Sequence, residues 1–124
     1  AYIFFYQLSK AIQKFEELLV WQKSQDFSVA IYKYFASNKD YAFKDQITKA
    51  SVSISNNIAE GFDRNSNADF KRFLFFATAS NSEVRSMLYL AIRLDFITKE
   101  KAGKLIDDSN KISKMLFGLI KSLK

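Results

Sequence analysis

The sequence predicts an all-α protein, an antiparallel up-down-up-down four-helix bundle, and three observations lead to this prediction. The 124 residues include no proline and only three glycines, so the many sharp turns of an all-β fold would lack their usual residues. Apolar residues recur at spacings of three and four, which is the period of one helix face. Short polar stretches separate four such segments, as expected for antiparallel helices joined by short links.

The length and composition favour a single domain. With 48% hydrophobic residues the chain has enough interior for one core, whereas two domains would each have too little. We assign residues 15–124 to the four-helix domain and residues 1–14 to an N-terminal extension. The aromatic cluster in residues 2–6 is too short to span a bilayer and has no basic region before it. We therefore expect no membrane partner.

The first two helices are expected at Leu18–Ala36 and Ala42–Glu60, separated by a polar link. Small and polar side chains outnumber large aliphatic ones in the second helix, so bulkier neighbours must approach it closely. Its inward stripe consists of Ile47, Ala50, Ser51, Ile54, Asn57 and Ile58. Gly61 is expected to end this helix by supplying the positive φ angle that a helix C-terminus commonly needs.

The third helix is expected to begin near Asn67, with Ser66 as its N-cap, and to reach about Leu94. It is apolar on two sides, because a helix advances about 100° per residue and its two apolar sets cannot share one face. The inward set is Phe70, Phe73, Leu74, Ala77, Val84, Leu88 and Ala91, and the second set is Phe75, Phe76, Tyr89, Leu90 and Leu94.

A second apolar stripe is costly when it is exposed on a soluble monomer, so we predict that the second set is a homo-oligomer interface. The alternative is a wide stripe that contacts two other helices of its own bundle. That alternative accounts for Phe76 and Leu94 better than for Phe75 and Tyr89.

The fourth helix, with Thr98 as its N-cap, is amphipathic and basic. Residues 99–124 carry seven lysines and three acidic residues, or +4 of the chain's formal net charge of +6. Lysines spaced over about five turns can follow phosphates without reading sequence. The nucleic-acid-binding candidates are Lys104, Lys111, Lys114 and Lys121 of this helix, together with Arg64 and Lys71. The alternative is a solvated lysine face that only increases solubility.

Histidine and cysteine are both absent, which removes the commonest general base, the usual zinc and haem ligands and any thiol nucleophile. Carboxylate pairs, Ser/Lys or Tyr/Lys arrangements and magnesium sites survive this exclusion, but no catalytic set with the usual geometry can be assembled from them. We therefore expect no catalytic residue, no metal, no cofactor and no enzyme. The lack of cysteine suits a reducing compartment, although it permits any other, and we expect a cytoplasmic protein.

Four segments of the chain carry a resemblance to a known family. They are VWQKSQDF at residues 20–27, SVSISNNIAEGFDR at 51–64, DFKRFLFFATASNSEV at 69–84 and KISKMLFGLIKSL at 111–123. Together they resemble the four-helix-bundle proteins encoded in intervening sequences of bacterial 23S ribosomal RNA genes. The accessory variability-determinant protein of diversity-generating retroelements is a related group. The resemblance implies no enzymatic activity, a ring of five subunits in some members, and a suspected affinity for nucleic acid.

Three polar residues are assigned to a structural network. Asn57 and Glu60, with Arg64 beyond them, match the family's NIAEGxxR segment and would suit a binding site. We favour the alternative that they hydrogen-bond neighbouring helices or turn backbone and fix register. Glu83 lies in the second stripe of the third helix and is expected to be paired or peripheral. Its candidate partners are Arg64, Arg72 and Arg85, from the same or another subunit, and Glu60 is the other candidate partner of Arg64.

The function predicted from the sequence is that of a non-enzymatic, homo-oligomeric accessory protein. Its basic surface would bind nucleic acid electrostatically, and we favour RNA over DNA as the ligand. The alternative is a protein-interaction scaffold that recruits a ribosomal or reverse-transcriptase partner.

Overall fold

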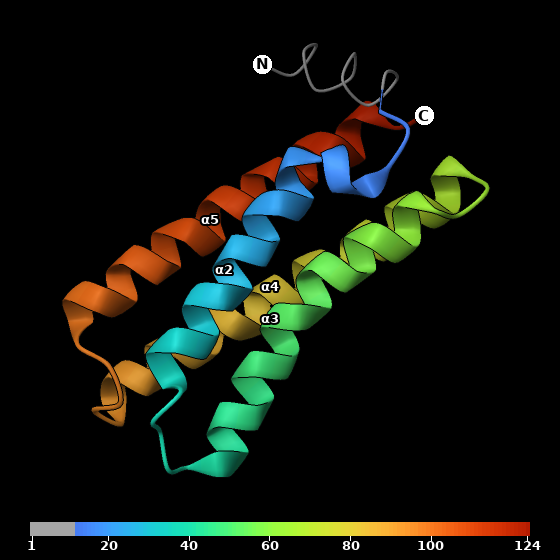
Figure 1. Ribbon diagram of the computed structural model, residues 1–124. Coiled ribbons are helices and arrows are strands. Elements are labelled where there is room, and N and C mark those ends of the chain that lie inside the picture. The colour runs from blue at the N-terminus through green and yellow to red at the C-terminus, as the bar shows by residue number, and fades with distance from the viewer. Residues whose placement is uncertain (1–11) are drawn as a thin grey trace.

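The computed structural model describes residues 12–124, and every regular element within them is a helix. A short 3-10 helix, η1 (Phe15–Glu17), precedes four long helices (Figure 1). These are α2 (Leu19–Phe35), α3 (Tyr41–Phe62), α4 (Asn67–Arg93) and α5 (Lys99–Ser122). The all-α prediction is confirmed, and the predicted limits of the first three long helices are within two residues of the observed ones. The predicted N-terminal extension falls mostly on residues 1–11, outside the described part of the chain.

Side-chain caps define where three of the helices begin. The side chains of Asp40, Ser66 and Thr98 accept hydrogen bonds from backbone N–H groups three residues further on, at 3.1, 3.1 and 3.2 Å. Each bond satisfies one of the donors that the first turn of a helix leaves without a partner. The predicted caps Ser66 and Thr98 are confirmed.

Gly61 does not end α3, and that prediction is wrong. The helix continues through Phe62, and no glycine has a positive φ angle. Gly61 is instead buried against α4, where an added Cβ atom would lie 2.6 Å from the Cβ of Phe73. Glycine is present because two backbones approach closely. Among residues 12–124 the positive φ angle belongs to Asp95, two residues after the end of α4, at 58°.

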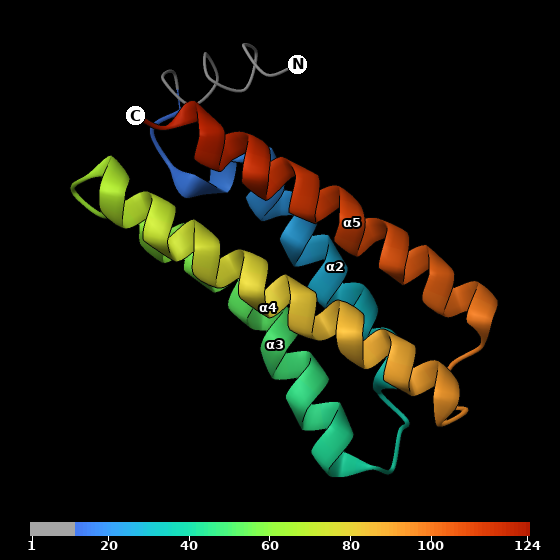
Figure 2. The same cartoon turned by 180° about the vertical axis from the view of Figure 1, so that it is seen from behind.

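The four long helices occupy the corners of a square. Each packs against the next along the chain and α5 returns to α2, while no backbone contact joins α2 with α4 or α3 with α5. Short links make successive helices antiparallel, which confirms the up-down-up-down arrangement. The α2–α3 face of the bundle is nearer the viewer in Figure 1, and the opposite α4–α5 face is nearer in Figure 2.

The core runs the length of the bundle and receives side chains from every long helix. Five of the six residues of the predicted α3 stripe are buried, and Ile47, Ile54 and Ile58 among them are fully buried, whereas Asn57 is only half-buried. Ser28 Oγ of α2 donates to the Ser51 carbonyl of α3 at 2.8 Å, so the small-residue seam also carries a hydrogen bond between helices. No helix within residues 12–124 is both long and apolar enough to cross a membrane.

Candidate nucleic-acid and self-association surfaces

Four of the exposed lysines of helix α5 lie along one side of it, and we call them the lysine ridge: Lys104, Lys111, Lys114 and Lys121. At about 100° per residue they fall within an arc of about 100°, and at about 1.5 Å per residue they extend over ~26 Å. None of the four lies within 4 Å of a described carboxylate as an ion pair. The ridge therefore presents ammonium groups that no partner in the described chain neutralises.

The lysine ridge points outward because the opposite side of α5 is buried. The core-facing residues include Ala102, Leu105, Ile112, Leu116 and Leu119, and each is less than a tenth exposed. Their spacings of three and four fix the orientation of the helix. Asp107 is exposed within the arc of the ridge, so this surface carries three net positive charges rather than four.

The two other basic candidates lie off the lysine ridge. Arg64 follows α3 and pairs with Glu60 at 3.2 Å, while its guanidinium lies 4.6 Å from the centroid of the Phe73 ring. It also lines a small pocket with Leu123, which places it near the C-terminal end of α5. Lys71 is half-buried in the second turn of α4. Arg64 thus has partners within the chain, whereas the ridge lysines lack carboxylate partners.

The second apolar set of α4 is exposed in the single chain. Its five residues, Phe75, Phe76, Tyr89, Leu90 and Leu94, are between 43% and 56% exposed. The bundle does not absorb Phe76 and Leu94, so the alternative in which the stripe serves only internal packing is not supported. An apolar surface of this kind on one helix is typical of an interaction site.

Sequence reasoning missed Phe117, which extends this surface onto α5. Phe117 is 46% exposed, and its ring lies edge-on to that of Phe75 with 6.4 Å between centroids. The sequence could have indicated the exposure of Phe117. It follows the core residue Leu116 and so lies about 100° around the helix from it, outside the buried stripe of α5. The α4–α5 face therefore carries an aromatic pair contributed by two helices.

The predicted polar network has different connections from those expected. Asn57 donates to the Ser53 carbonyl and hydroxyl, at 2.8 and 2.9 Å, and the Ser53 hydroxyl accepts from Ser80 Oγ of α4 at 2.9 Å. Arg64 forms its ion pair with Glu60 and not with its other candidate partner, Glu83. Glu83 is exposed and accepts a hydrogen bond from Gln46 of α3 at 3.3 Å.

Glu83 forms no ion pair with a described residue, because its three candidate partners point elsewhere. Arg64 pairs with Glu60, Arg72 lies 3.7 Å from Asp69, and Arg85 donates to Ser109. Within residues 12–124 the candidate arginines do not pair with Glu83; pairing with an arginine of another subunit stays a prediction, and the peripheral position is confirmed.

The most buried polar cluster was not foreseen. Asn81 of α4 donates from Nδ2 to the Ser109 carbonyl of α5, and Ser109 Oγ donates to Asn81 Oδ1, both at 2.9 Å. Arg85 donates to the same hydroxyl at 3.0 Å. Asn81 and Ser109 are almost fully buried, and both fall on apolar stripes at spacings of three and four. A polar residue at a core position of each helix is the sequence pattern that could have predicted a buried polar pair.

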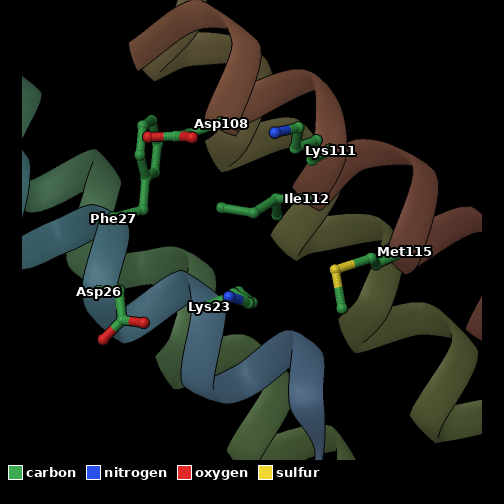
Figure 3. A pocket seen from close by; sticks show the side chains of 7 residues that line it. All are labelled: Lys23, Asp26, Phe27, Asp108, Lys111, Ile112 and Met115. Carbon is green, nitrogen blue, oxygen red and sulfur yellow. The ribbon is translucent and has the colours of Figure 1, made fainter. Parts of the chain in front are cut away.

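A groove of about 260 Å³ lies between α2 and α5 (Figure 3). Its floor is apolar, and Figure 3 shows Asp26 and Asp108 toward one end and Lys23 and Lys111 toward the other. Lys111 belongs to both the groove and the lysine ridge. The groove adds one further lysine, Lys23, and two aspartates, so it adds no positive charge to the ridge. Among residues 12–124 no three acidic side chains gather as metal ligands would.

The chain is similar to known proteins over its helical domain. A family model described as 23S rRNA-intervening sequence protein matches residues 16–118. A crystal structure of a protein of unknown function from the S23 ribosomal protein family of Bacteroides thetaiotaomicron has 34% sequence identity and a TM-score of 0.78. The similarity covers 83% of this chain and 99% of that chain. No curated protein matches the sequence.

Proposed function

This chain belongs to the family of 23S rRNA-intervening sequence proteins, and we propose that it is a non-enzymatic, self-associating accessory protein that binds RNA through the lysine ridge. The observation that supports RNA binding is the ridge itself. Four lysines share one side of α5, and none forms an ion pair with a described carboxylate. The resemblance to proteins encoded within ribosomal RNA genes favours RNA over DNA.

The chemistry of this contact is electrostatic. Each ammonium group that meets a phosphate releases counterions, so affinity depends steeply on salt and only weakly on base sequence. A straight ridge of ~26 Å suits the regular phosphates of a backbone and has no loop that enters a groove to read bases. We therefore expect binding that responds to RNA charge and shape rather than to sequence.

Self-association is the second part of the proposal, and the exposed apolar residues of α4 support it. An assembly would cover Phe75, Tyr89 and their neighbours and would repeat the lysine ridge once per copy. Several weak ridges on one particle bind a long RNA more tightly than a single ridge, because every contact after the first is intramolecular.

The test is a salt titration of binding to a mixed-sequence RNA hairpin, with fluorescence anisotropy as the readout. We expect the logarithm of affinity to fall linearly with the logarithm of salt concentration. A variant with Lys104, Lys111, Lys114 and Lys121 changed to Gln should bind at least tenfold more weakly near physiological salt. Its slope should fall by roughly 3, since each lost phosphate contact removes ~0.7–0.9.

The matched control changes Lys14, Lys23, Lys39 and Lys49 to Gln, which lowers the net charge equally at four exposed positions outside α5. It should retain most of the affinity and the slope. Equal losses in both variants would show that net charge, rather than the ridge, attracts RNA. Absence of binding at low salt, or an affinity indifferent to salt, would remove the electrostatic proposal entirely.

A protein-interaction scaffold is the second candidate, and the exposed α4 surface favours it as well. In that case the surface would meet a ribosomal component or a reverse transcriptase. Capture of such a partner that survives nuclease treatment and is lost in a Phe75→Glu variant would favour the scaffold. Capture that nuclease abolishes would favour the RNA proposal.

A further inference from the structure

The groove between α2 and α5, which we call the α2–α5 groove, has charged walls whose arrangement the packing of the bundle does not explain (Figure 3). Each helix contributes one aspartate and one lysine three residues apart, Asp26 with Lys23 on α2 and Asp108 with Lys111 on α5. Because the two helices are antiparallel, the aspartates lie toward one end of the groove and the lysines toward the other. Like charges therefore face each other across it.

None of these four charged groups forms an ion pair with a residue of the described chain. Opposite charges that faced each other would stabilise the contact between α2 and α5, whereas like charges repel. A bound molecule with hydrogen-bond donors at one end and an anionic group at the other would complement both ends of the groove at once. The charge pattern therefore suits a ligand whose two ends differ.

The floor of the groove between these charged ends is apolar. Phe27 of α2 and Ile112 of α5 are each 2% exposed, and the half-buried Met115 lines the groove one turn beyond Lys111. An unbranched, polarisable methionine adapts its shape to a flat ring. The volume of about 260 Å³ is just below the ~300–1,000 Å³ typical of small-molecule pockets, so the groove has room for one ring system and not for a folded partner.

We propose that the α2–α5 groove binds one unpaired guanine nucleotide of the RNA. This inference rests on the RNA binding proposed above and deepens it, because Lys111 belongs to both the lysine ridge and the groove. Its ammonium group holds the phosphate of that nucleotide, and the base lies over the apolar floor. The Watson–Crick edge of the base then faces Asp26 and Asp108 at the far end of the groove.

Guanine is the base that best complements two carboxylates. Its Watson–Crick edge presents two adjacent donors, N1–H and the N2 amino group, which one carboxylate can accept together. Adenine and cytosine present an acceptor nitrogen beside their amino group, and uracil presents one donor between two carbonyl oxygens. The base must be unpaired, since pairing occupies this edge and stacking covers the faces of the ring. The groove thus adds a preference at one nucleotide to binding that is otherwise indifferent to sequence.

The test compares blunt RNA duplexes by fluorescence anisotropy: one fully paired, one with a single bulged guanine and one with a bulged uracil at the same place. The two bulged duplexes have equal charge and similar shape, so a difference between them reports on the edge of the base. We expect the guanine bulge to bind at least about fivefold more tightly near physiological salt. Equal affinities for the two bulges would overturn the guanine site, while the lysine ridge would stand if binding still depended on salt. Absence of binding to every duplex would overturn the proposed RNA binding itself.

The groove variant D26N/D108N separates the reading of the base from net charge. It gains two positive charges, so it should bind every duplex at least as tightly as the unchanged protein does. Its preference for the guanine bulge should nevertheless fall below about twofold, because a neutral amide accepts a hydrogen bond more weakly than a carboxylate.

The matched control is D45N/D63N, which changes the charge equally at two exposed aspartates outside the groove. It should keep the full preference for the guanine bulge, and circular dichroism should show both variants folded. A groove variant that keeps the preference would show that Asp26 and Asp108 do not read the base, and would overturn the proposal. A control that loses the preference as well would assign it to net charge, with the same consequence.

Discussion

Gly61 shows how a single residue is misread when only the local chain is considered. The sequence around it suggested a helix end, since glycine after a polar run commonly supplies a positive φ angle. The actual requirement comes from α4, whose Phe73 Cβ would lie 2.6 Å from an added methyl group and whose Phe70 carbonyl oxygen would lie 3.3 Å from it. The sequence of one helix does not record the distance to another, so this reason was not predictable.

We predict that Gly61→Ala destabilises the protein by about 1–3 kcal/mol, because overpacking outweighs the better helix propensity of alanine. Gly103→Ala and Gly118→Ala are matched controls, since an added Cβ atom meets nothing within 4 Å at either position. Both should be stabilising by about 0.5–1 kcal/mol. Urea unfolding at one protein concentration measures all three, and a neutral or stabilising Gly61→Ala would contradict the close approach.

The Asn81–Ser109 pair predicts a second effect at single residues. Ser109→Ala leaves the side-chain carbonyl of Asn81 without its donor in a buried position, which should reduce stability by about 1–3 kcal/mol. Ser82→Ala, an exposed position one residue from Asn81, should change stability by less than about 0.5 kcal/mol. Equal effects in urea unfolding would show that the buried pair has no special role.

At the scale of helices, the sequence predicted well which side of each helix faces water. It predicted poorly which side chains of neighbouring helices contact each other. The apolar stripe of α5 determines which side faces water, so the exposure of Lys104, Lys111, Lys114 and Lys121 followed directly. The contact of Phe75 with Phe117 and the bonds of Asn81 with Ser109 depend on how α4 and α5 are rotated and shifted against each other. A periodic pattern fixes one face of a helix but not its register with a neighbour.

The N-cap of α5 gives a prediction at this scale. Thr98→Ala removes the oxygen that accepts from the Lys101 N–H, and should destabilise the protein by about 1 kcal/mol. Thr98→Ser keeps the oxygen and should change little. Thr78→Ala removes the same atoms from the middle of α4 and should be neutral or slightly stabilising, since alanine favours a helix interior. A loss in urea unfolding as large for Thr98→Ser as for Thr98→Ala would contradict a capping role.

For the whole molecule, the fold and family were predictable because helix period, short links and four quoted segments agree. The exposed apolar set of α4 was foreseen from its second stripe, whereas the shallow hollow between α2 and α3 was not. Val29 and Tyr32 of α2 form no apolar stripe of their own, and they line a hollow only because α3 brings Val52 beside them.

Self-association should make thermal stability depend on protein concentration, because copies bind the folded state and not the unfolded one. Well above the dissociation constant, each tenfold increase in concentration adds about 1.4 kcal/mol, which should raise the unfolding midpoint of a chain this size by a few degrees. A variant with Phe75 and Phe117 both changed to Glu loses the exposed rings, and its midpoint should not depend on concentration. Leu19→Glu changes an exposed apolar residue of α2 and should keep the dependence. Calorimetry over a hundredfold range of concentration measures this. An equally flat response in the unchanged protein and the double variant would mean that the exposed rings of α4 and α5 serve something other than a second copy.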